Sequence, residues 1–333
     1  MGQKKGHQKG SPQSSHFKLN TSLSLSECID AFIDDMCTNG IQHPPSQVIA
    51  DGELHIFSPS GKKGDTAGRY VFHADGIPSG YYQDFRQGLK VTWSAGSNAA
   101  SSMTPAERKA YKQQMRKQAE ARRIKQEEEH QNAAEEARYI WQHAQPASPN
   151  HAYLIKKQVQ RHNLKQYKHD LIIPLHDAGG KLWSIQRVGS NGFKMMLKGG
   201  RKRGNFCLIG AALSDLDQLD CINMVEGWAT GASVYETYDV PVIVAFDAGN
   251  LLPVTKAIKH RWPYLAMTLI ADNDRKAVAE GRTNVGVESA KAVADQFLNV
   301  FVEVPQFPET APLALSDFND LVNWRGDQAG GRV

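Results

Sequence analysis

Short apolar runs alternate with helix-like segments over the last third of the chain, and this alternation restricts the possible folds more than any other feature. The apolar runs are CINMV at 221–225, VPVIVAF at 240–246, LAMTLIA at 265–271 and VFVEV at 300–304. Nearly continuous apolar strands between helices are typical of a parallel sheet covered on both faces. Such sheets bind ligands at the carboxyl ends of their strands. We therefore predict an α/β domain over 218–325, with its functional site at that edge.

The N-terminal region has a different pattern, which predicts a small α+β module over 21–100. Cys28, Phe32 and Met36 have helical spacing, and Gly40 ends that helix. Strand-like stretches separated by turn residues then indicate a meandering antiparallel sheet. They lie at 53–59, 68–85 and 89–95. Outside these regions we predict a disordered basic tail at 1–20 and a C-terminal tail at 326–333.

A long charged helix is predicted over 104–144. Thr104 and Glu107 are suited to a capping box, and Pro105 to the first helical turn. Large apolar residues return only at Tyr139 to Trp141, so the packing face is expected at the far end. The basic first half is consistent either with contact to a phosphate backbone or with a solvated linker.

Strands joined by glycine turns are predicted over 150–212, a basic, strand-rich subdomain with a hairpin signal at Asp177 to Gly180. The densest basic run of this segment is KMMLKGGRKRGN at 194–205. Its glycines allow backbone amides to approach phosphates, so we expect contacts with nucleotides and with a nucleic-acid backbone. An exposed charged hairpin is the alternative. The basic residues are Lys194, Lys198, Arg201, Lys202 and Arg203.

Acidic residues follow three of the predicted parallel strands, at Glu226, at Asp247, and at Asp272 with Asp274. In an extended segment Asp272 and Asp274 point to the same side. Two carboxylates on one side repel each other unless a cation lies between them, and Mg²⁺ prefers such oxygen ligands. The pair therefore indicates either a metal site or the start of a polar loop.

A glutamate at one strand end and an Asp-x-Asp pair beyond the next βαβ step together resemble a Toprim domain. Glu226 in VEGWATG matches the glutamate of that family, and Asp272 and Asp274 in IADND match the pair. The glycine that follows Glu226 permits a tight turn from strand to helix. Since Toprim domains serve primases, topoisomerases, nucleases and recombination factors, the domain alone does not define the reaction.

The segment before this domain resembles the one that precedes Toprim in bacterial-type primases. In that comparison Arg187 and Lys194 match the basic residues of the polymerase site. Most of 80–325 further resembles the Toprim primases of conjugative plasmids and phages, the TraC-like type, in motifs such as LKGGRKRG, VEGWATGASV and DFNDL. FDAGN stands where cellular primases have a Gly-Thr loop, and no Cys/His zinc ribbon is evident.

This resemblance implies a DNA primase with an α/β Toprim domain, preceded by an α+β primase-core subdomain, the long helix and the small N-terminal module. The implied activity is synthesis of RNA primers from NTPs on single-stranded DNA, with Mg²⁺ or Mn²⁺ held by Glu226, Asp272 and Asp274. Glu226 could instead act as a general base. The implied setting is a plasmid, phage or other mobile element, with a replicative helicase or single-stranded-DNA-binding protein as partner. The alternatives are a Toprim nuclease and a non-catalytic DNA-binding factor.

Several further acids and bases are weaker candidates. Asp247, Asp317 and Asp320 are suited to an outer metal contact, although Asp317 or Asp320 could equally cap a helix. Arg275 and Lys276 follow the acidic pair directly and are either triphosphate contacts or solvated side chains.

Four scattered cysteines, Cys28, Cys37, Cys207 and Cys221, are too few for a disulfide framework and lack the C-x-x-C spacing of a zinc knuckle. We predict no zinc site. The sequence has neither an apolar signal core near its start nor an apolar run of membrane-spanning length. We therefore expect a cytoplasmic protein that does not interact with membranes.

Overall fold

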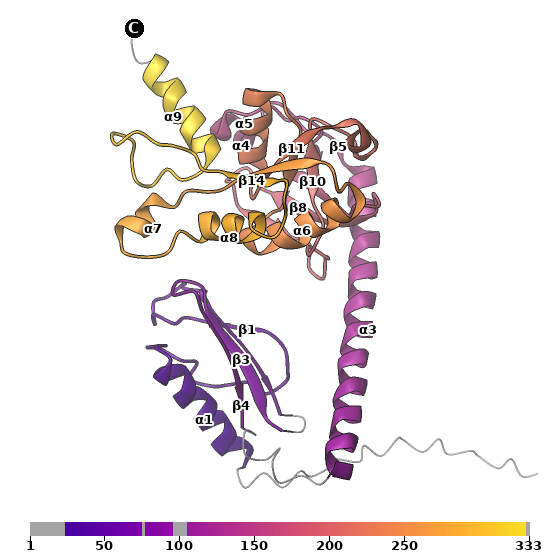
Figure 1. Ribbon diagram of the computed structural model, residues 1–333, viewed down its shortest axis with the longest axis vertical. Helices are drawn as coiled ribbons and strands as arrows, with labels where there is room; N and C mark the ends of the chain where they lie inside the picture. The colour runs from indigo at the N-terminus through magenta and orange to yellow at the C-terminus, as the bar shows by residue number, and fades with distance from the viewer. Residues whose placement is uncertain (1–23, 75–76, 96–104, 331–333) are drawn as a thin grey trace, which may run out of the picture. The chain divides into compact units, whose positions relative to one another are not determined.

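The chain divides into two units between Glu120 and Ala121, and each is described by itself. The computed structural model describes residues 24–74, 77–95 and 105–330 (Figure 1). The predicted tail at 1–20, the predicted cap Thr104 and the last three residues lie outside these ranges. Helix α3 (Pro105–His143) crosses the division as one helix of 39 residues.

In the first unit, α1 packs on an antiparallel sheet. The elements are α1 (Leu25–Thr38), β1 (His55–Phe57), β2 (Gly68–His73), β3 (Ser79–Asp84) and β4 (Leu89–Ser94). Ser24 and Glu27 form a capping box at the start of α1. The strand order β1-β2-β3-β4 confirms the predicted meander. Phe32 of α1 packs so closely on β3 that a Cβ at Gly80 would lie 2.6 Å from its ring.

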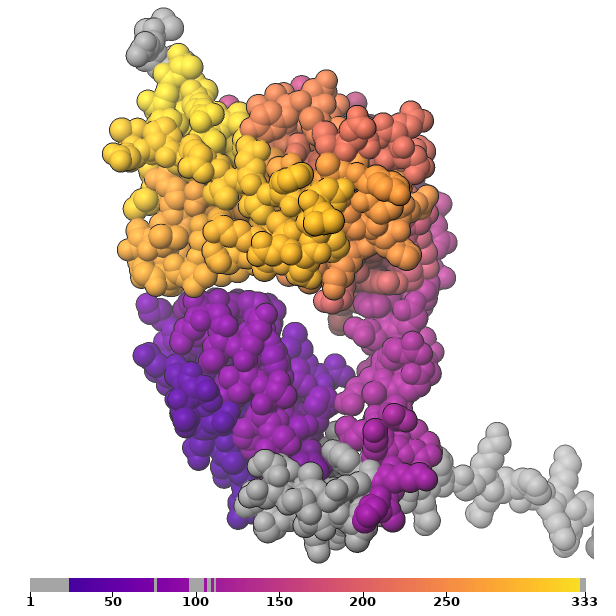
Figure 2. All heavy atoms as spheres, viewed as in Figure 1, coloured from indigo at the N-terminus to yellow at the C-terminus, as the bar shows by residue number. Residues whose placement is uncertain are grey.

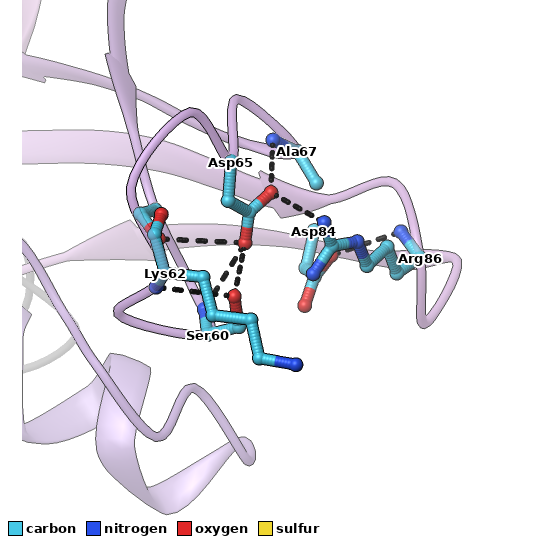
Figure 3. Close-up of polar contacts among 7 residues, drawn as sticks. Ser60, Lys62, Asp65, Ala67, Asp84 and Arg86 are labelled. Carbon is cyan, nitrogen blue, oxygen red and sulfur yellow. Dashed lines mark hydrogen bonds and ion pairs between the residues drawn. The ribbon is translucent and has the colours of Figure 1, made fainter.

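The loop between β1 and β2 is held by Asp65, whose side chain is only 2% exposed (Figure 3). Its carboxylate accepts hydrogen bonds from Ser60 Oγ at 2.5 Å and from the Ala67 N–H at 3.0 Å. Arg86, just beyond β3, pairs with the same carboxylate at 2.9 Å. A buried carboxylate needs such partners, and here they fix the loop against the end of the sheet.

The packed part of α3 lies toward its C-terminal end, as predicted, but small residues extend it. Ala133, Ala134, Ala137 and Ile140 are all buried, whereas Tyr139 is 56% exposed. Alanines allow close approach and do not register as large apolar residues, so the sequence pattern underestimated the length of this face. Among the described residues, no helix has both the length and the apolar character that a membrane span requires.

The second unit contains one antiparallel sheet of order β5-β6-β7-β8-β9. Its elements are β5 (Gln145–Pro146), α4 (Ala152–Lys157), β6 (Lys165–Tyr167), β7 (Asp170–His176), β8 (Leu182–Val188) and β9 (Lys194–Met196). The predicted hairpin joins β7 to β8. Asp177 stabilises it by accepting hydrogen bonds from the Gly179 and Lys181 N–H groups and from Trp183 Nε1.

A second, largely parallel sheet has the order β10-β12-β11-β13-β14. The elements are β10 (Cys207–Ile209), the 3₁₀ helix η1 (Leu213–Gln218), β11 (Cys221–Val225), α5 (Trp228–Tyr238), β12 (Val242–Val244), α6 (Ala248–Arg261), β13 (Ala266–Ile270), α7 (Arg275–Ala279), α8 (Val285–Ala294) and β14 (Val300–Glu303). Strands β11 to β14 pair in parallel, which confirms the predicted α/β pattern. Strand β10 pairs antiparallel with β12. Phe206, just before β10, forms an isolated bridge with His176 of the β5–β9 sheet.

Helix α9 (Phe318–Gly330) closes the described part of the second unit and continues past the predicted domain end at 325. Its N-terminal half is held by Asn319, which is fully buried and donates to Ser233 Oγ of α5 and to the Lys157 carbonyl of α4. The remainder projects from this unit at the yellow end of the chain (Figure 2). The buried Asn319 amide thus links the start of α9 to two other helices.

Candidate active site

A pocket of about 170 Å³ lies at the carboxyl edge of the parallel sheet. We call it the acidic pocket. Its charged lining residues are Glu226, Asp272, Asp317, Lys157 and Lys194. Glu226 directly follows β11, and Asp272 lies just beyond the neighbouring strand β13, so parallel pairing brings the two carboxylates to one edge.

Glu226 lies in surroundings that disfavour its charge. Burial, followed by the nearby carboxylates of Asp272 and Asp247, raises the pKa of Glu226 to about 7. The backbone N–H of Ala248 acts in the opposite direction by favouring the ionised form. A carboxyl group with this pKa is suited to exchanging a proton near neutral pH.

Asp272 is in a similar position. Burial and the Asp317 carboxylate raise the pKa of Asp272 to about 7, with a smaller contribution from Asp320. Lys194 and Lys157 partly compensate, since each favours the ionised aspartate. Two neighbouring acids with raised pKa values are a common feature of functional sites.

One oxygen of each of these two acids is buried without a hydrogen-bond partner: Glu226 Oε1 and Asp272 Oδ1. Buried carboxylate oxygens are costly to leave unpaired. Mg²⁺ typically takes one or two protein carboxylates and completes its shell with water or phosphate oxygens, so the pair fits such an ion. Within the part of the chain that the structure describes, no group of three or more His, Cys, Asp or Glu could hold a metal ion. A cation here would therefore need water or substrate oxygens as further ligands.

Two lysines reach the acidic pocket from different elements. Lys194 is the first residue of β9, and burial and the neighbouring Lys157 lower its pKa, against the attraction of Asp317 and Asp272. Lys157 ends α4, with its Nζ 3.6 Å from Asp320 Oδ1. Lys194 was predicted from the sequence but Lys157 was not, since nothing in the local pattern separates Lys157 from an ordinary helix-ending lysine.

Gly286 is a second residue near these acids that was not predicted from the sequence. It lies in the first turn of α8, where a Cβ would be 2.7 Å from the Asp272 carbonyl oxygen and 3.4 Å from Glu226 Oε1. Only glycine fits there without displacing one of them. A glycine just inside a predicted helix was the available signal, because glycine is unfavourable at such positions.

Asp274 lies outside the lining of the acidic pocket. The pair was expected to point to one side in an extended segment, but β13 ends at Ile270 and the chain turns into α7. The Asp274 carboxylate caps α7 by accepting a hydrogen bond from the Ala277 N–H at 2.9 Å. Its metal role remains a prediction.

The three weaker acidic candidates have separate surroundings. Asp317 lines the pocket and also accepts from the Asp320 N–H at 2.8 Å, while Asp320 accepts from the Ser316 N–H at 3.1 Å. This reciprocal pair caps α9, as the alternative interpretation proposed. The Asp247 carboxylate contributes to the raised pKa of Glu226 and forms an ion pair with Lys202.

The basic candidates are more dispersed. Arg187 lies on β8 with a buried Nε that has no partner. Arg201 stacks over Trp183 at 4.5 Å, while Lys198, Arg203 and Lys276 are exposed. Arg275 donates to the Ala311 carbonyl at 2.8 Å and stacks over Phe307, so it also supports the loop before α9. Among the basic candidates, all of which the structure describes, Lys194 alone lines the acidic pocket.

Comparisons with known proteins identify relatives of this chain. Over 265 residues it is 33% identical to a DNA primase TraC of Escherichia coli, covering 77% of this chain and 24% of the relative. A second Escherichia coli DNA primase TraC is 31% identical over 255 residues, or 74% of this chain and 17% of the relative. The chain thus spans about a quarter or less of the length of these relatives. No family model matches it.

Solved structures with some likeness are also primase fragments. The primase fragment of the bacteriophage T7 primase-helicase is 14% identical with a TM-score of 0.37, covering 53% of this chain and 70% of that one. The RNA polymerase domain of Mycobacterium tuberculosis primase DnaG in complex with double-stranded DNA is 14% identical with a TM-score of 0.35, covering 59% and 76%. Scores this low do not establish a shared fold.

Proposed function

Because this chain is a homologue of the DNA primases named TraC over about three quarters of its length, we propose that it synthesises RNA primers from NTPs on a single-stranded DNA template. The observation that carries the proposal is the acidic pocket. There Glu226 and Asp272 each present a buried, unpartnered carboxylate oxygen beside the ammonium groups of Lys194 and Lys157. Acidic oxygens and ammonium groups in one pocket suit a phosphorylated substrate and its counter-ion.

The proposed reaction is nucleotidyl transfer. The 3′-oxygen of one nucleotide attacks the α-phosphorus of the next, the bond to the β-phosphate breaks, and pyrophosphate leaves. A divalent cation bound by Glu226 and Asp272 would neutralise the triphosphate and lower the pKa of the attacking hydroxyl. Lys194 and Lys157 would bind phosphate oxygens. In the alternative role, Glu226 does not bind the cation, and its pKa of about 7 suits it to accept the proton of the 3′-hydroxyl.

The wider setting is part of the same proposal. We expect the chain to act in the cytoplasm for a plasmid, phage or other mobile element, beside a replicative helicase or a single-stranded-DNA-binding protein. The proposed contacts with nucleotide or template remain Arg187, Lys198, Arg201, Lys202, Arg203, Arg275 and Lys276. Asp274 remains a proposed metal ligand, and Asp247, Asp317 and Asp320 remain the proposed outer acids.

Purified protein incubated with single-stranded DNA, labelled NTPs and Mg²⁺ or Mn²⁺ is expected to produce short RNA. The Glu226→Gln variant should lose at least about 99% of this product, since several kcal/mol of charge stabilisation correspond to roughly a hundredfold or more in rate. Asp295→Asn is the matched control, because Asp295 is an exposed acid at the end of α8. It should synthesise primers at the normal rate.

Other products of this assay would contradict primer synthesis. Shortened DNA without RNA, lost in Glu226→Gln, would identify a Toprim nuclease. DNA binding without any product, unchanged in Glu226→Gln, would identify a non-catalytic binding factor.

A divalent cation is expected to stabilise the chain more at pH 8 than at pH 5. The folded-state pKa values of Glu226 and Asp272 are both about 7, so at pH 5 protons occupy the carboxyls and at pH 8 the cation competes with none. At a concentration about 100 times Kd, Mg²⁺ should raise the Tm at pH 8 by roughly 5 °C. Differential scanning fluorimetry measures this shift.

The combined variant Glu226→Gln with Asp272→Asn should lose the cation response at pH 8, whereas Asp295→Asn should keep it. An equal response at both pH values, or one retained by the combined variant, would show that the cation binds elsewhere.

A further inference from the structure

The sheet of the first unit has two different faces. Strand alternation directs Tyr70, Phe72 and Tyr82 toward α1, where they pack around Phe32. The opposite face, which we call the open face, is half-buried or exposed at nearly every position. It includes Ile56, Arg69, Tyr81, Gln83, Lys90 and Thr92. Ile56 is 56% exposed, and Lys90 and Thr92 are exposed as well. Large side chains therefore remain accessible on this face of the sheet.

The aromatic groups of the open face are fixed in place. The Arg69 guanidinium lies 4.8 Å above the ring of Phe85, which is itself 48% exposed at the end of β3. The Tyr81 hydroxyl donates to Gln83 Oε1 at 2.5 Å and so orients both side chains. A stacked guanidinium and a held phenol ring provide two flat platforms for unpaired bases.

On β2, β3 and β4, the charged side chains of the open face are basic. Arg69, Gln83 and Lys90 lie side by side in one row across β2, β3 and β4, and Arg69 Nε is buried without a hydrogen-bond partner. Among the residues described on this face of the three strands, none is acidic. A cationic row suits an anionic partner more than an apolar protein surface.

We propose that the open face binds single-stranded nucleic acid. Bases stack on Tyr81 and on the Arg69–Phe85 pair, and phosphates lie along Arg69 and Lys90. This site is separate from the acidic pocket in sequence and in chemistry, because it needs neither a cation nor a nucleotide. Its ligand is recognised through base stacking and backbone charge, so little sequence preference is expected.

The test measures binding of fluorescein-labelled oligo(dT) to the full chain by anisotropy, in EDTA and without NTPs. Tyr81→Ala should weaken binding roughly tenfold, whereas Tyr81→Phe, which keeps the ring, should bind within about twofold of wild type. Arg69→Gln with Lys90→Gln should reduce the slope of log K against log salt by about 1.4, or about 0.7 for each phosphate contact.

Lys62→Gln with Lys63→Gln is the matched control. It removes the same charge from the β1–β2 loop, where the Lys62 ammonium points away from Asp65 (Figure 3). Its affinity should change less than about twofold. Oligonucleotides containing 5-iodouracil should crosslink to peptides carrying Tyr81 or Phe85.

Three outcomes would overturn the proposal. In the first, Tyr81→Ala binds as wild type with an unchanged unfolding temperature. In the second, the loop and face variants weaken binding equally, which indicates charge alone. In the third, the face variants change only the oligomeric state, which identifies a protein-docking surface. Because EDTA suppresses catalysis, each result is independent of whether primer synthesis is found.

Discussion

Replacing Asp272 with asparagine is expected to abolish primer synthesis while raising the thermal stability of the chain at pH 8. The activity should fall by roughly a hundredfold or more, because Asp272 supplies one of the two unpartnered carboxylate oxygens of the acidic pocket. The free energy of unfolding at pH 8 should rise, because the folded chain holds this carboxyl in surroundings that oppose its ionisation.

The sign follows from the two pKa values of Asp272. An unfolded aspartate has a pKa near 3.9, whereas the folded value is about 7. A carboxyl whose pKa is higher in the folded chain than in the unfolded chain contributes to the free energy of unfolding. This contribution is fully present below about pH 4 and is lost as the pH rises toward 7. Its upper bound is about 4 kcal/mol, and partial solvent access reduces it. Asparagine carries no charge, so the Tm of Asp272→Asn should exceed that of wild type by at least about 2 °C at pH 8 and match it near pH 4.

Asp295→Asn removes an exposed acid and should alter neither activity nor Tm. If Asp272→Asn instead lowered the Tm at pH 8, Asp272 would be a structural residue. If it retained primer synthesis, the acidic pocket would not be the catalytic site.

Gly286→Ala is expected to cause the second large effect. The added methyl group would meet the Asp272 carbonyl oxygen at 2.7 Å and Glu226 Oε1 at 3.4 Å, so α8 or the two acids must move. Overpacking of this kind costs about 1–3 kcal/mol of stability. A displacement of about 1 Å in a catalytic group costs roughly a hundredfold in rate. Primer assays and thermal unfolding measure the two effects separately.

Gly326→Ala is the matched control, because a Cβ at Gly326 in α9 meets nothing within 4 Å. It should preserve activity and leave the Tm unchanged or slightly higher. Normal activity in Gly286→Ala would mean that α8 can shift without disturbing Glu226 and Asp272.

Much of the fold could be predicted from local patterns. The apolar strands from β11 to β14 alternate with helices so regularly that their parallel pairing followed. The hairpin at Asp177 was equally readable, because its turn residues carry the signal themselves. The antiparallel pairing of β10 could not be predicted, since a three-residue strand has no periodicity that indicates its direction.

In the candidate site, too, some residues could be predicted from local patterns and others could not. Glu226 and Asp272 could be selected because Glu226 directly follows β11 and Asp272 lies just beyond β13. Lys157 and Gly286 could not, because their importance comes from tertiary proximity to those acids. Asp274 was grouped with Asp272 on the assumption of an extended segment, whereas the structure begins a helix there and uses its carboxylate as the cap.

The buried amide of Asn319 has a consequence for how the acidic pocket is assembled. Asn319 holds α9 to the end of α4, where Lys157 lies, and Asp317 immediately precedes α9. Two walls of the pocket thus depend on a helix that follows both catalytic candidates by more than forty residues. A chain interrupted before Asp317 would contain Glu226, Asp272 and Lys157 but would lack Asp317 and the helix that Asn319 holds against α4. Premature termination in this region would therefore act as a loss of catalysis even where the parallel sheet still forms.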